Sequence, residues 1–541
     1  MKSILLYDTT LRDGTQGEQI AFTATDKLKI SQKLDELGIH YIEGGWPGSN
    51  VKDREFFEAA RNEHFRNAKL TAFGATHRYG IRAENDGNLN AIISCGAKVA
   101  TIFGKTWDLH VEKILRIRPE DNLDIIRESV EYLKQNGLEV HYDAEHFFDG
   151  YRENPNYAIA TLTAAITGGA DFIGLCDTNG GSLPHDVEAM VKDVIAHFSL
   201  AENISSNRPP VGFGIHTHND SGLAVANTIA AVRTGAVLVQ GTINGYGERC
   251  GNADLTSIIP ILKLKMGYPC ISDENLTRLQ NVSLFVSETA NMTPLNSRPF
   301  VGKSAFAHKG GIHVNAISKD ARSYEHMDPR LVGNRQRVLI SDMSGKSNID
   351  YKIKELGLSL EADGIDAGKI VAQIKQLEKE GYQFDDADGT FQIMIEKLTH
   401  QFKSMFDLDS FRVIIEKNKN ESCHSHAIIK ISVDGEVQDI TVAEGHGPVS
   451  ALDNALRKAL NKVYPKALDP VHLVDFKVRV LDGRDGTGAK VRVLIESRDA
   501  GSIWSTIGVS EDVIEASWQA LADSFQHKLS RLEKEQVLKK S

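Results

Sequence analysis

Short apolar segments alternate with longer amphipathic segments over the first half of the chain. The short segments are rich in β-branched residues and end at Gly, Asp or Asn, which is typical of buried strands. The longer ones, such as Asp26–Leu37 and Leu123–Asn136, have helical spacing. For the first of these we expect Thr25 as the N-cap and Gly38 as the stop signal. We predict strands over Ser3–Asp8, Ile39–Gly44, Lys69–Gly74, Lys98–Phe103, Leu138–Glu145, Asp171–Cys176, Val211–His218 and Ala236–Ile243.

This α/β alternation predicts a (β/α)8 TIM barrel over residues 1–270. Eight strands and their helices over about 265 residues have the length and order of that fold. The alternative is an open, doubly wound sheet. Such a sheet usually has fewer strands and a Gly-rich first turn, and no Gly-x-Gly-x-x-Gly follows the first strand here.

The pattern changes beyond Met266. Residues 271–395 predict helical pieces, which we interpret as helical linker subdomains. Residues 396–541 predict a separate α+β unit. Its expected strands are Phe411–Glu416, His426–Val433, Val437–Val442, Val471–Leu481 and Gly488–Glu496, and its expected helices are Ala451–Val463 and Asp512–Lys534.

Composition narrows the class of protein. The chain has 541 residues, which exceeds one hydrophobic core, and its 41% apolar and 25% charged residues are ordinary for a globular protein. The net charge of −11 disfavours nucleic acid as a partner. We expect no signal peptide and no membrane span, because no apolar stretch approaches the roughly 18 residues that a span needs. The five cysteines are widely spaced without a Cys-x-x-Cys pair, which favours the cytoplasm.

Two histidines at the end of the seventh predicted strand are candidate metal ligands. His216 and His218 are two residues apart, so both side chains point to the same face of a strand. Asp13 follows the first strand, and in a closed barrel its rim lies near the later strands. Two histidines and a carboxylate suit a catalytic divalent cation, with Mg, Mn, Co and Zn all open, and Asn252 could add an oxygen. The His pair alone could equally be satisfied by hydrogen bonds.

Other polar residues fall at the same predicted rim. Glu43 and Glu145 end strands two and five, and each could be a general base, could orient Arg12, or could form a rim salt bridge. Arg12 is a fixed cation and a bidentate donor, suited to an enolate or a keto oxygen. Thr178 could hold a substrate carboxylate or could cap a helix.

A second group of candidates lies beyond the barrel. The Gly-Gly-Ile-His loop that ends at His313 could supply an acid or base if it folded over a barrel mouth, and Tyr324 follows it. The alternative is a purely structural histidine.

Three of these motifs together resemble a known superfamily. Asp8–Gln16, His216–Asp220 and Gly245–Asn252 look like the signatures of the DRE-TIM metallolyases. The acyl-CoA-condensing branch of that superfamily contains 2-isopropylmalate, homocitrate and citramalate synthases. Gly310–His313 resembles the linker of that branch, and Gly445–Pro448 resembles its regulatory domain. The resemblance covers essentially the whole chain.

The resemblance assigns expected roles to individual residues. The implied metal ligands are Asp13, His216, His218 and Asn252. The implied substrate-binding residues are Arg12, Gln16, Glu43 and Thr178. The implied catalytic residues are Arg12, Glu145, His313 and Tyr324. Asp143 and Ala144 depart from the Ser-Cys pair of the isopropylmalate enzymes, which affects the expected shape of the pocket.

The resemblance also implies an activity. The stretches Tyr7–Gly17 and Tyr41–Asn50 are most similar to the branch members that condense acetyl-CoA with pyruvate to give (R)-citramalate and CoA, in isoleucine biosynthesis. Synthesis of 2-isopropylmalate from 2-oxoisovalerate is the alternative within the same chemistry. A metal-dependent lyase or aldolase and a binding protein with an inactive site are more distant alternatives. We further expect a homodimer whose linkers reach the partner's barrel. We also expect feedback control through the C-terminal unit, by isoleucine if the product is citramalate and by leucine if it is isopropylmalate.

Overall fold

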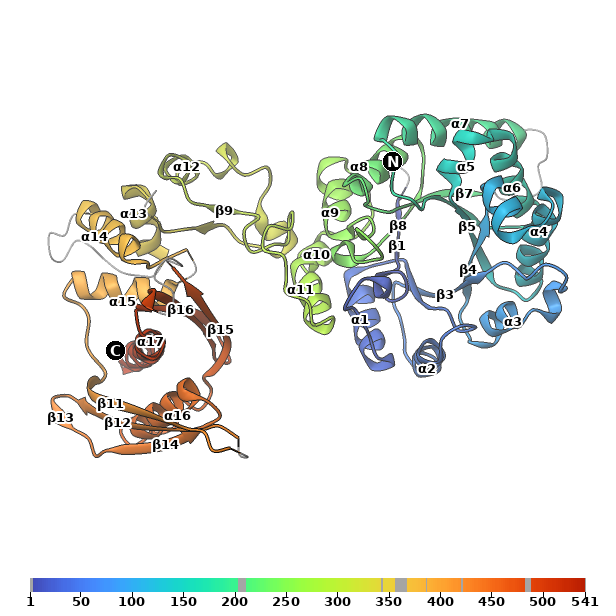
Figure 1. The fold of residues 1–541 in the computed structure, drawn as a ribbon. Helices are drawn as coiled ribbons and strands as arrows, with labels where there is room; N and C mark the ends of the chain where they lie inside the picture. Colours follow the sequence, from blue (N-terminus) through green and yellow to red (C-terminus); the bar gives the residue numbers. More distant parts are fainter. Residues whose placement is uncertain are drawn as a thin grey trace. The chain divides into compact units, whose positions relative to one another are not determined.

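The computed structural model of the protein describes residues 3–202, 211–341, 344–355, 367–385, 387–419, 422–481 and 488–540. The chain forms two compact units (Figure 1). The first consists of Met1–Phe306 and Met327–Arg335, and the second of Ala307–His326 and Gln336–Ser541. No helix in the described ranges is long and apolar enough to cross a membrane.

Eight parallel strands form a closed barrel in the first unit, drawn from blue to green in Figure 1. The first strand pairs with both the second and the eighth, which closes the sheet and excludes the open-sheet alternative. The predicted barrel is therefore confirmed. The strands are β1 (Leu5–Asp8), β2 (Tyr41–Gly45), β3 (Lys69–Ala75), β4 (Val99–Lys105), β5 (Glu139–Glu145), β6 (Phe172–Asp177), β7 (Gly212–Thr217) and β8 (Leu238–Gly241).

Helices surround this barrel. They are α1 (Ala24–Leu37), α2 (Val51–Ala60), α3 (Gly87–Ser94), α4 (Pro119–Gln135), α5 (Phe147–Glu153), α6 (Pro155–Gly168), α7 (Pro184–Glu202) and α8 (Ala224–Thr234). Three more follow in the same unit, α9 (Leu255–Pro260), α10 (Asp273–Leu276) and α11 (Leu279–Thr289).

The first helix begins two residues earlier than the sequence suggested. Thr23, not Thr25, is its N-cap, because the Thr23 hydroxyl accepts the amide hydrogen of Asp26 and the Asp26 carboxylate accepts the amide hydrogen of Thr23. This reciprocal pair satisfies two amide groups at once. Gly38 ends the helix with φ 93°, as expected.

Aromatic and aliphatic side chains fill the inside of the barrel. Tyr7, Tyr41, Val99 and Leu238 form a buried cluster of their own, apart from the larger core that includes Leu6. Alternation along a strand explains this division, because neighbouring residues point to opposite faces of the sheet. The polar residues at the strand ends therefore rest on a packed interior.

The second unit starts with a small helical region. It contains β9 (Ala307–His308), β10 (Arg337–Val338), α12 (Gly311–Ile317), α13 (Lys346–Glu355), α14 (Ala367–Glu380) and α15 (Asp388–Leu398). β9 and β10 form a parallel pair that the sequence did not predict, since each has only two residues. A buried cluster that includes Ile349, Ile370 and Phe391 joins the helices.

Two antiparallel sheets follow, as the predicted α+β unit requires. The first contains β11 (Asp407–Glu416), β12 (His424–Val433), β13 (Glu436–Val437) and β14 (Thr441–Gly445) and is covered by α16 (Pro448–Leu460). The second contains β15 (His472–Val480), β16 (Val491–Arg498) and β17 (Ile503–Ser510) and is covered by α17 (Val513–Lys540).

Two details of this unit differ from the sequence prediction. Val437–Val442 is not one strand, because β13 and β14 pair separately with β12. Strand β17 was not predicted, since Gly508 interrupts its pattern. A Cβ atom at Gly508 would lie 2.0 Å from the carbonyl oxygen of Ala516, so this glycine allows α17 to pack closely on the strand.

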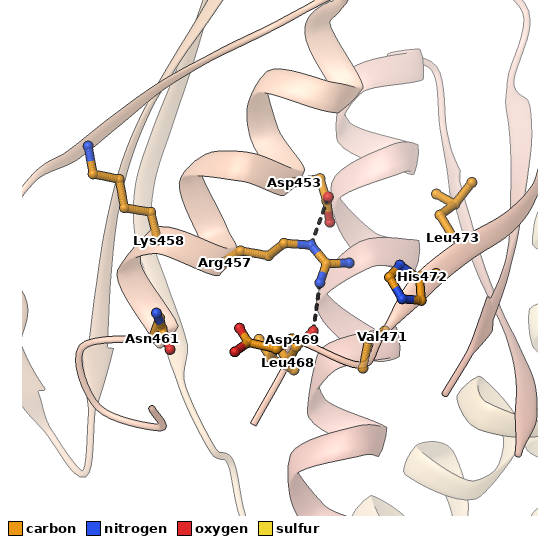
Figure 2. A pocket seen from close by; sticks show the side chains of 9 residues that line it. All are labelled: Asp453, Arg457, Lys458, Asn461, Leu468, Asp469, Val471, His472 and Leu473. Carbon is orange, nitrogen blue, oxygen red and sulfur yellow. Dashed lines mark hydrogen bonds and ion pairs between the residues drawn. The ribbon is translucent and has the colours of Figure 1, made fainter. Parts of the chain in front are cut away.

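A cavity in the second unit has a volume of about 640 Å³ and lies beside α16 (Figure 2). Arg457 occupies its centre, where Nε donates to Asp453 (2.9 Å) and a terminal nitrogen donates to the carbonyl oxygen of Leu468 (2.9 Å). Lys458 and Asp469 also line it, so the cavity offers both positive and negative groups.

Candidate metal centre and active site

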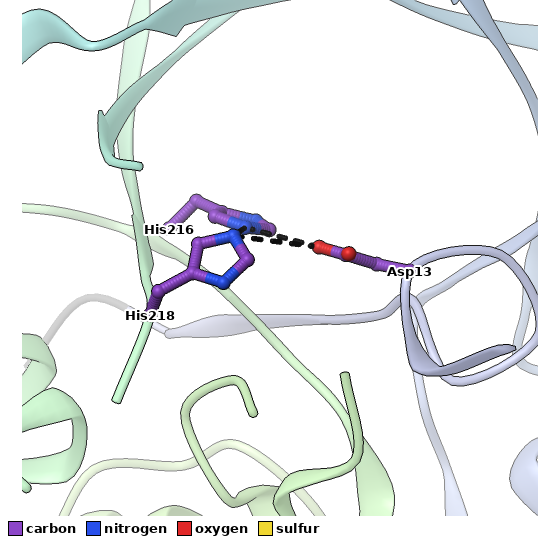
Figure 3. Close-up of side chains that lie close together, drawn as sticks. All are labelled: Asp13, His216 and His218. Carbon is purple, nitrogen blue, oxygen red and sulfur yellow. Dashed lines mark hydrogen bonds and ion pairs between the residues drawn. The ribbon is translucent and has the colours of Figure 1, made fainter. Parts of the chain in front are cut away.

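Asp13, His216 and His218 meet at the C-terminal end of the barrel (Figure 3). His216 lies on β7 and His218 directly after it, while Asp13 precedes the short 3-10 helix η1 (Gly14–Gln16) that follows β1. Asp13 Oδ2 is 3.3 Å from His216 Nε2 and 3.8 Å from His218 Nε2. The two imidazole Nε2 atoms are 3.3 Å apart. The structure thus brings Asp13 next to two histidines that lie about two hundred residues later in the sequence.

These side chains fit a divalent cation. Bonds of about 2.0–2.2 Å place neighbouring ligand atoms roughly 3.0–3.6 Å apart, close to the observed spacing. All three residues are buried. Asn252 pairs with His218 as an isolated β-bridge, and its buried Oδ1 has no hydrogen-bond partner among the described residues. That oxygen is a candidate fourth ligand, as the resemblance implied. A site of nitrogen and oxygen ligands does not select among Mg, Mn, Co and Zn.

The electrostatic surroundings favour the metal-binding forms of Asp13 and His218. Burial alone would raise the pKa of Asp13, but the Arg12 guanidinium and the two imidazoles hold it well below its usual range. Burial and the neighbouring His216 lower the pKa of His218 to about 4. Burial opposes protonation of His216 too, but its contact with Asp13 raises the pKa above the ordinary value. A charged carboxylate and an imidazole with a free lone pair are the forms that bind metals.

His216 has a second polar partner on the side away from Asp13. Its Nδ1 is 2.8 Å from Oε1 of Gln240 on β8, and Gln240 Nε2 donates to Asp143 Oδ1 on β5 at 2.7 Å. Burial raises the pKa of Asp143 to about 6. Gln240 was not among the residues that the sequence motifs predicted for the site. Its only signal was an amide in an otherwise apolar segment.

Arg12 and Glu43 form a buried ion pair next to the three candidate ligands. Arg12 Nε donates to Glu43 Oε1 at 2.5 Å, and its guanidinium carbon lies 3.7 Å from the centre of the Phe73 ring. Glu43 is fully buried and also accepts hydrogen bonds from Thr9 (2.6 Å) and from the Tyr7 hydroxyl. Glu43 does not line the neighbouring cavity. Its geometry supports a role in orienting Arg12, rather than the substrate contact that the resemblance implied.

A cavity of about 240 Å³ lies in front of Arg12 and the candidate ligands. The predicted residues Gln16, Glu145 and Thr178 line it. The full lining is Arg12, Asp13, Gln16, Trp46, Phe73, Phe103, Asp143, Glu145, Cys176, Thr178, His216, His218, Glu248 and Arg249. This volume suits a small organic acid.

One wall of the cavity is aromatic. The ring centres of Trp46, Phe73 and Phe103 lie 5.5–5.7 Å from one another. Phe73 lies on β3, Phe103 lies on β4, and Trp46 directly follows β2, so no local sequence pattern marks them as a group. The wall limits the size of a group that binds against it.

Glu145 and Thr178 are held by local contacts. Glu145 forms an ion pair with Lys105 at the end of the neighbouring strand β4. The Thr178 hydroxyl oxygen accepts the amide hydrogen of His146 at 2.8 Å, so its own hydrogen is free to be donated. Thr178 is not a helix cap, because α7 begins only at Pro184. Its position at the cavity supports the alternative of contact with a substrate carboxylate.

His313 and Tyr324 belong to the second unit. His313 lies on α12, and Tyr324 follows the short 3-10 helix η6 (Ala321–Ser323). Their rings stack with centres 4.2 Å apart, and both side chains are exposed. The structure therefore brings these two predicted residues together.

Comparison with known proteins identifies the family. The HMGL-like family matches residues 3–286, the homocitrate synthase post-HMGL domain-like family matches residues 300–382, and the LeuA allosteric (dimerisation) domain matches residues 386–529. An (R)-citramalate synthase of Geobacter sulfurreducens is 51% identical over 541 residues, which is 100% of both chains. The chain belongs to the (R)-citramalate synthase family. The predicted superfamily is thereby confirmed.

Two further relatives show how similar this (R)-citramalate synthase family member is to enzymes of each activity. An (R)-citramalate synthase of Aquifex aeolicus is 49% identical over 99% of this chain and 100% of its own length. A 2-isopropylmalate synthase of Methanocaldococcus jannaschii is 29% identical over 98% of this chain and 96% of its own length. The alternative within the same chemistry is thus the more distant one.

Proposed function

We propose that the protein is a metal-dependent acyltransferase that condenses acetyl-CoA with pyruvate and water to give (R)-citramalate and CoA. The observation that carries this proposal is full-length identity of 44–51% to several (R)-citramalate synthases, in a chain whose Asp13, His216 and His218 converge at the barrel mouth. The pathway would be isoleucine biosynthesis in the cytoplasm.

The cavity supports binding of pyruvate. A cation held by Asp13, His216 and His218 would polarise the ketone of pyruvate as a Lewis acid. The Thr178 hydroxyl, with its free hydrogen, would donate to the pyruvate carboxylate. Gln16 would supply a further polar contact from the cavity wall. The aromatic wall of Trp46, Phe73 and Phe103 would accept a methyl group and crowd a branched one.

The remaining polar side chains at the cavity would assist formation of the carbon–carbon bond. A base removes a proton from the acetyl methyl group, and the resulting carbon attacks the ketone carbon of pyruvate. The Arg12 guanidinium, held by Glu43, would stabilise the enolate oxygen and the alkoxide oxygen as each becomes negative. Glu145 would then act as an acid or base at the cavity. Water finally cleaves the thioester and releases CoA.

His313 and Tyr324 are our candidates for deprotonating acetyl-CoA or activating water. Their stacked rings would let Tyr324 hold the imidazole of His313 in one orientation. We propose that they act on the barrel of the partner subunit in a homodimer. The match to the LeuA allosteric (dimerisation) domain supports a dimer.

We propose residues 1–270 as the catalytic domain, 271–395 as linker subdomains and 396–541 as the regulatory domain. The effector would be isoleucine. The cavity beside α16 supports this because an amino acid carries both an ammonium and a carboxylate group, and acidic and basic side chains face each other there (Figure 2).

The test is a comparison of keto acids as acceptors. Purified protein is incubated with acetyl-CoA and either pyruvate or 2-oxoisovalerate, and release of the CoA thiol is followed with and without a chelator. We expect pyruvate to be preferred and the chelator to abolish the rate. A preference for 2-oxoisovalerate would instead assign the chain to 2-isopropylmalate synthesis.

A further inference from the structure

A buried row of side chains crosses the barrel behind the candidate metal ligands. Asp143 on β5, Gln240 on β8 and His216 on β7 are joined by hydrogen bonds of 2.7 and 2.8 Å. Their exposed fractions are 4%, 1% and 5%, so all three groups are largely shielded from solvent. The row ends at His216 Nε2, which faces Asp13.

The chemistry of the row fixes which nitrogen of His216 carries the hydrogen. An ionised Asp143 can only accept hydrogen bonds, so the amide nitrogen of Gln240 must face it. The amide oxygen of Gln240 must then face His216 Nδ1 and accept a hydrogen from it. Nε2 of His216 is left with its lone pair directed toward Asp13. This is the tautomer that can bind a cation there.

A glycine makes room for the row. Gly174 on β6 lies beside Asp143 in the strand register, between the strands that carry Asp143 and His216. A Cβ atom at this position would lie 2.2 Å from Asp143 Oδ1 and 3.0 Å from Gln240 Nε2. Any side chain here would therefore displace the Asp143–Gln240 hydrogen bond. The Asp143–Gln240 hydrogen bond therefore requires a glycine at this position of β6.

We propose that Gln240 is a positioning residue for the metal centre. Asp143 orients its amide in the space that Gly174 leaves, and the amide oxygen holds His216 in the metal-binding tautomer and ring orientation. The inference rests on the proposed function of Asp13, His216 and His218 as metal ligands. Loss of such an outer partner typically weakens metal affinity about 10–100-fold.

The experiment is calorimetric titration of the metal-free, full-length protein with Mn²⁺ or Co²⁺, with the visible absorption of bound Co²⁺ as a second readout. We expect Gln240→Leu to weaken metal binding about 10–100-fold and to change the Co²⁺ spectrum. Gly174→Ala should give a similar defect although Gln240 itself is intact. If Gln240→Leu does not fold, Gln240→Asn is measured in its place. Its side chain is one methylene shorter and cannot bridge Asp143 and His216.

Thr71→Val is the matched control. Thr71 is a fully buried barrel residue whose hydroxyl has no hydrogen-bond partner in the described structure. Its substitution should leave metal affinity unchanged, while the urea midpoint of the metal-free protein reports general damage in each variant. The inference would be overturned if Gln240→Leu bound metal as tightly as the wild type while His216→Ala lost binding. The proposed metal centre itself would still hold in that case. Equal weakening by Thr71→Val would also overturn the inference. No metal binding by the wild type would overturn both.

Discussion

Replacement of Glu43 by Gln tests whether this buried carboxylate sets the position of Arg12. Glu43 accepts hydrogen bonds from Arg12 Nε (2.5 Å), Thr9 (2.6 Å) and the hydroxyl of Tyr7. Gln has nearly the same shape, but it removes the negative charge and places an NH2 group against one of these donors. The nearest remaining carboxylate to Arg12 is Asp13, whose Oδ1 is 3.8 Å from a terminal guanidinium nitrogen.

Two separate effects are expected, one on stability and one on catalysis. Removing one partner of a buried ion pair costs about 3–5 kcal/mol, and because Asp13 still offsets part of the Arg12 charge we expect the lower end of that range. A misplaced donor to a developing oxyanion lowers kcat about 10²–10³-fold, equivalent to roughly 2.7–4 kcal/mol. Glu43→Gln should therefore be less stable to urea and, once folded, slow with pyruvate.

The assay measures kcat and KM by thiol release at a temperature where the variant is folded, together with its urea midpoint. Asp35→Asn is the control because Asp35 is also a buried carboxylate of the barrel. It accepts three backbone amide hydrogens at 2.7–3.0 Å, from Arg66, Asn67 and Ala68, and it does not line the cavity. Asp35→Asn should lose stability and keep its kcat. The reasoning fails if Glu43→Gln also keeps the wild-type kcat.

Three further predictions concern the cavity wall and the second unit. Lys105→Met removes the ion-pair partner of Glu145, so kcat should fall about tenfold or more. Metal affinity, measured by titration, should stay unchanged. An unchanged kcat would show that Glu145 has no part in the proposed chemistry. Phe103→Ala removes one ring from the aromatic wall and enlarges the cavity, so kcat/KM for 2-oxoisovalerate relative to pyruvate should rise by about tenfold or more. An unaltered ratio would exclude the wall as a size filter. Burial raises the pKa of Asp523 to about 6 despite its hydrogen bond from Thr390, so the folded state holds this proton more tightly than the unfolded state. The ionised Asp523 side chain therefore lowers the free energy of unfolding above about pH 6. It has no such effect below about pH 4, which is the pKa of the group in the unfolded chain. Asp523→Asn should raise the urea stability of the protein at pH 8 by up to about 3 kcal/mol, a difference that narrows as the pH falls through 6; a difference independent of pH would contradict this account.

The strand order and part of the site could be predicted from sequence because they depend on local patterns. A His-x-His pair places both rings on one face of a strand, and the βα order brings strand ends to one rim. The row of Asp143 and Gln240 could not be predicted, since it depends on the register of strands far apart in sequence. The same applies to Glu43, whose position behind Arg12 follows from the way β1 and β2 pair.

The misplaced helix start and the missed strand have different causes. The cap at Thr23 rests on a local reciprocal bond with Asp26, and a neighbouring Thr at position 25 is an equally good cap by residue type. Strand β17 contains Gly508, which weakens a strand pattern although the packing of α17 requires it. In this strand, local propensity gives way to tertiary packing.

The most direct test of the proposed reaction follows the new carbon–carbon bond. Metal-free protein is incubated with acetyl-CoA labelled with ¹³C at the methyl carbon and with pyruvate, and the products are analysed by NMR and chiral chromatography before and after addition of a divalent cation. The account predicts (R)-citramalate labelled at its methylene carbon, one molecule for each CoA released, only after the cation is added. Release of CoA without citramalate, or formation of citramalate without the cation, would contradict it.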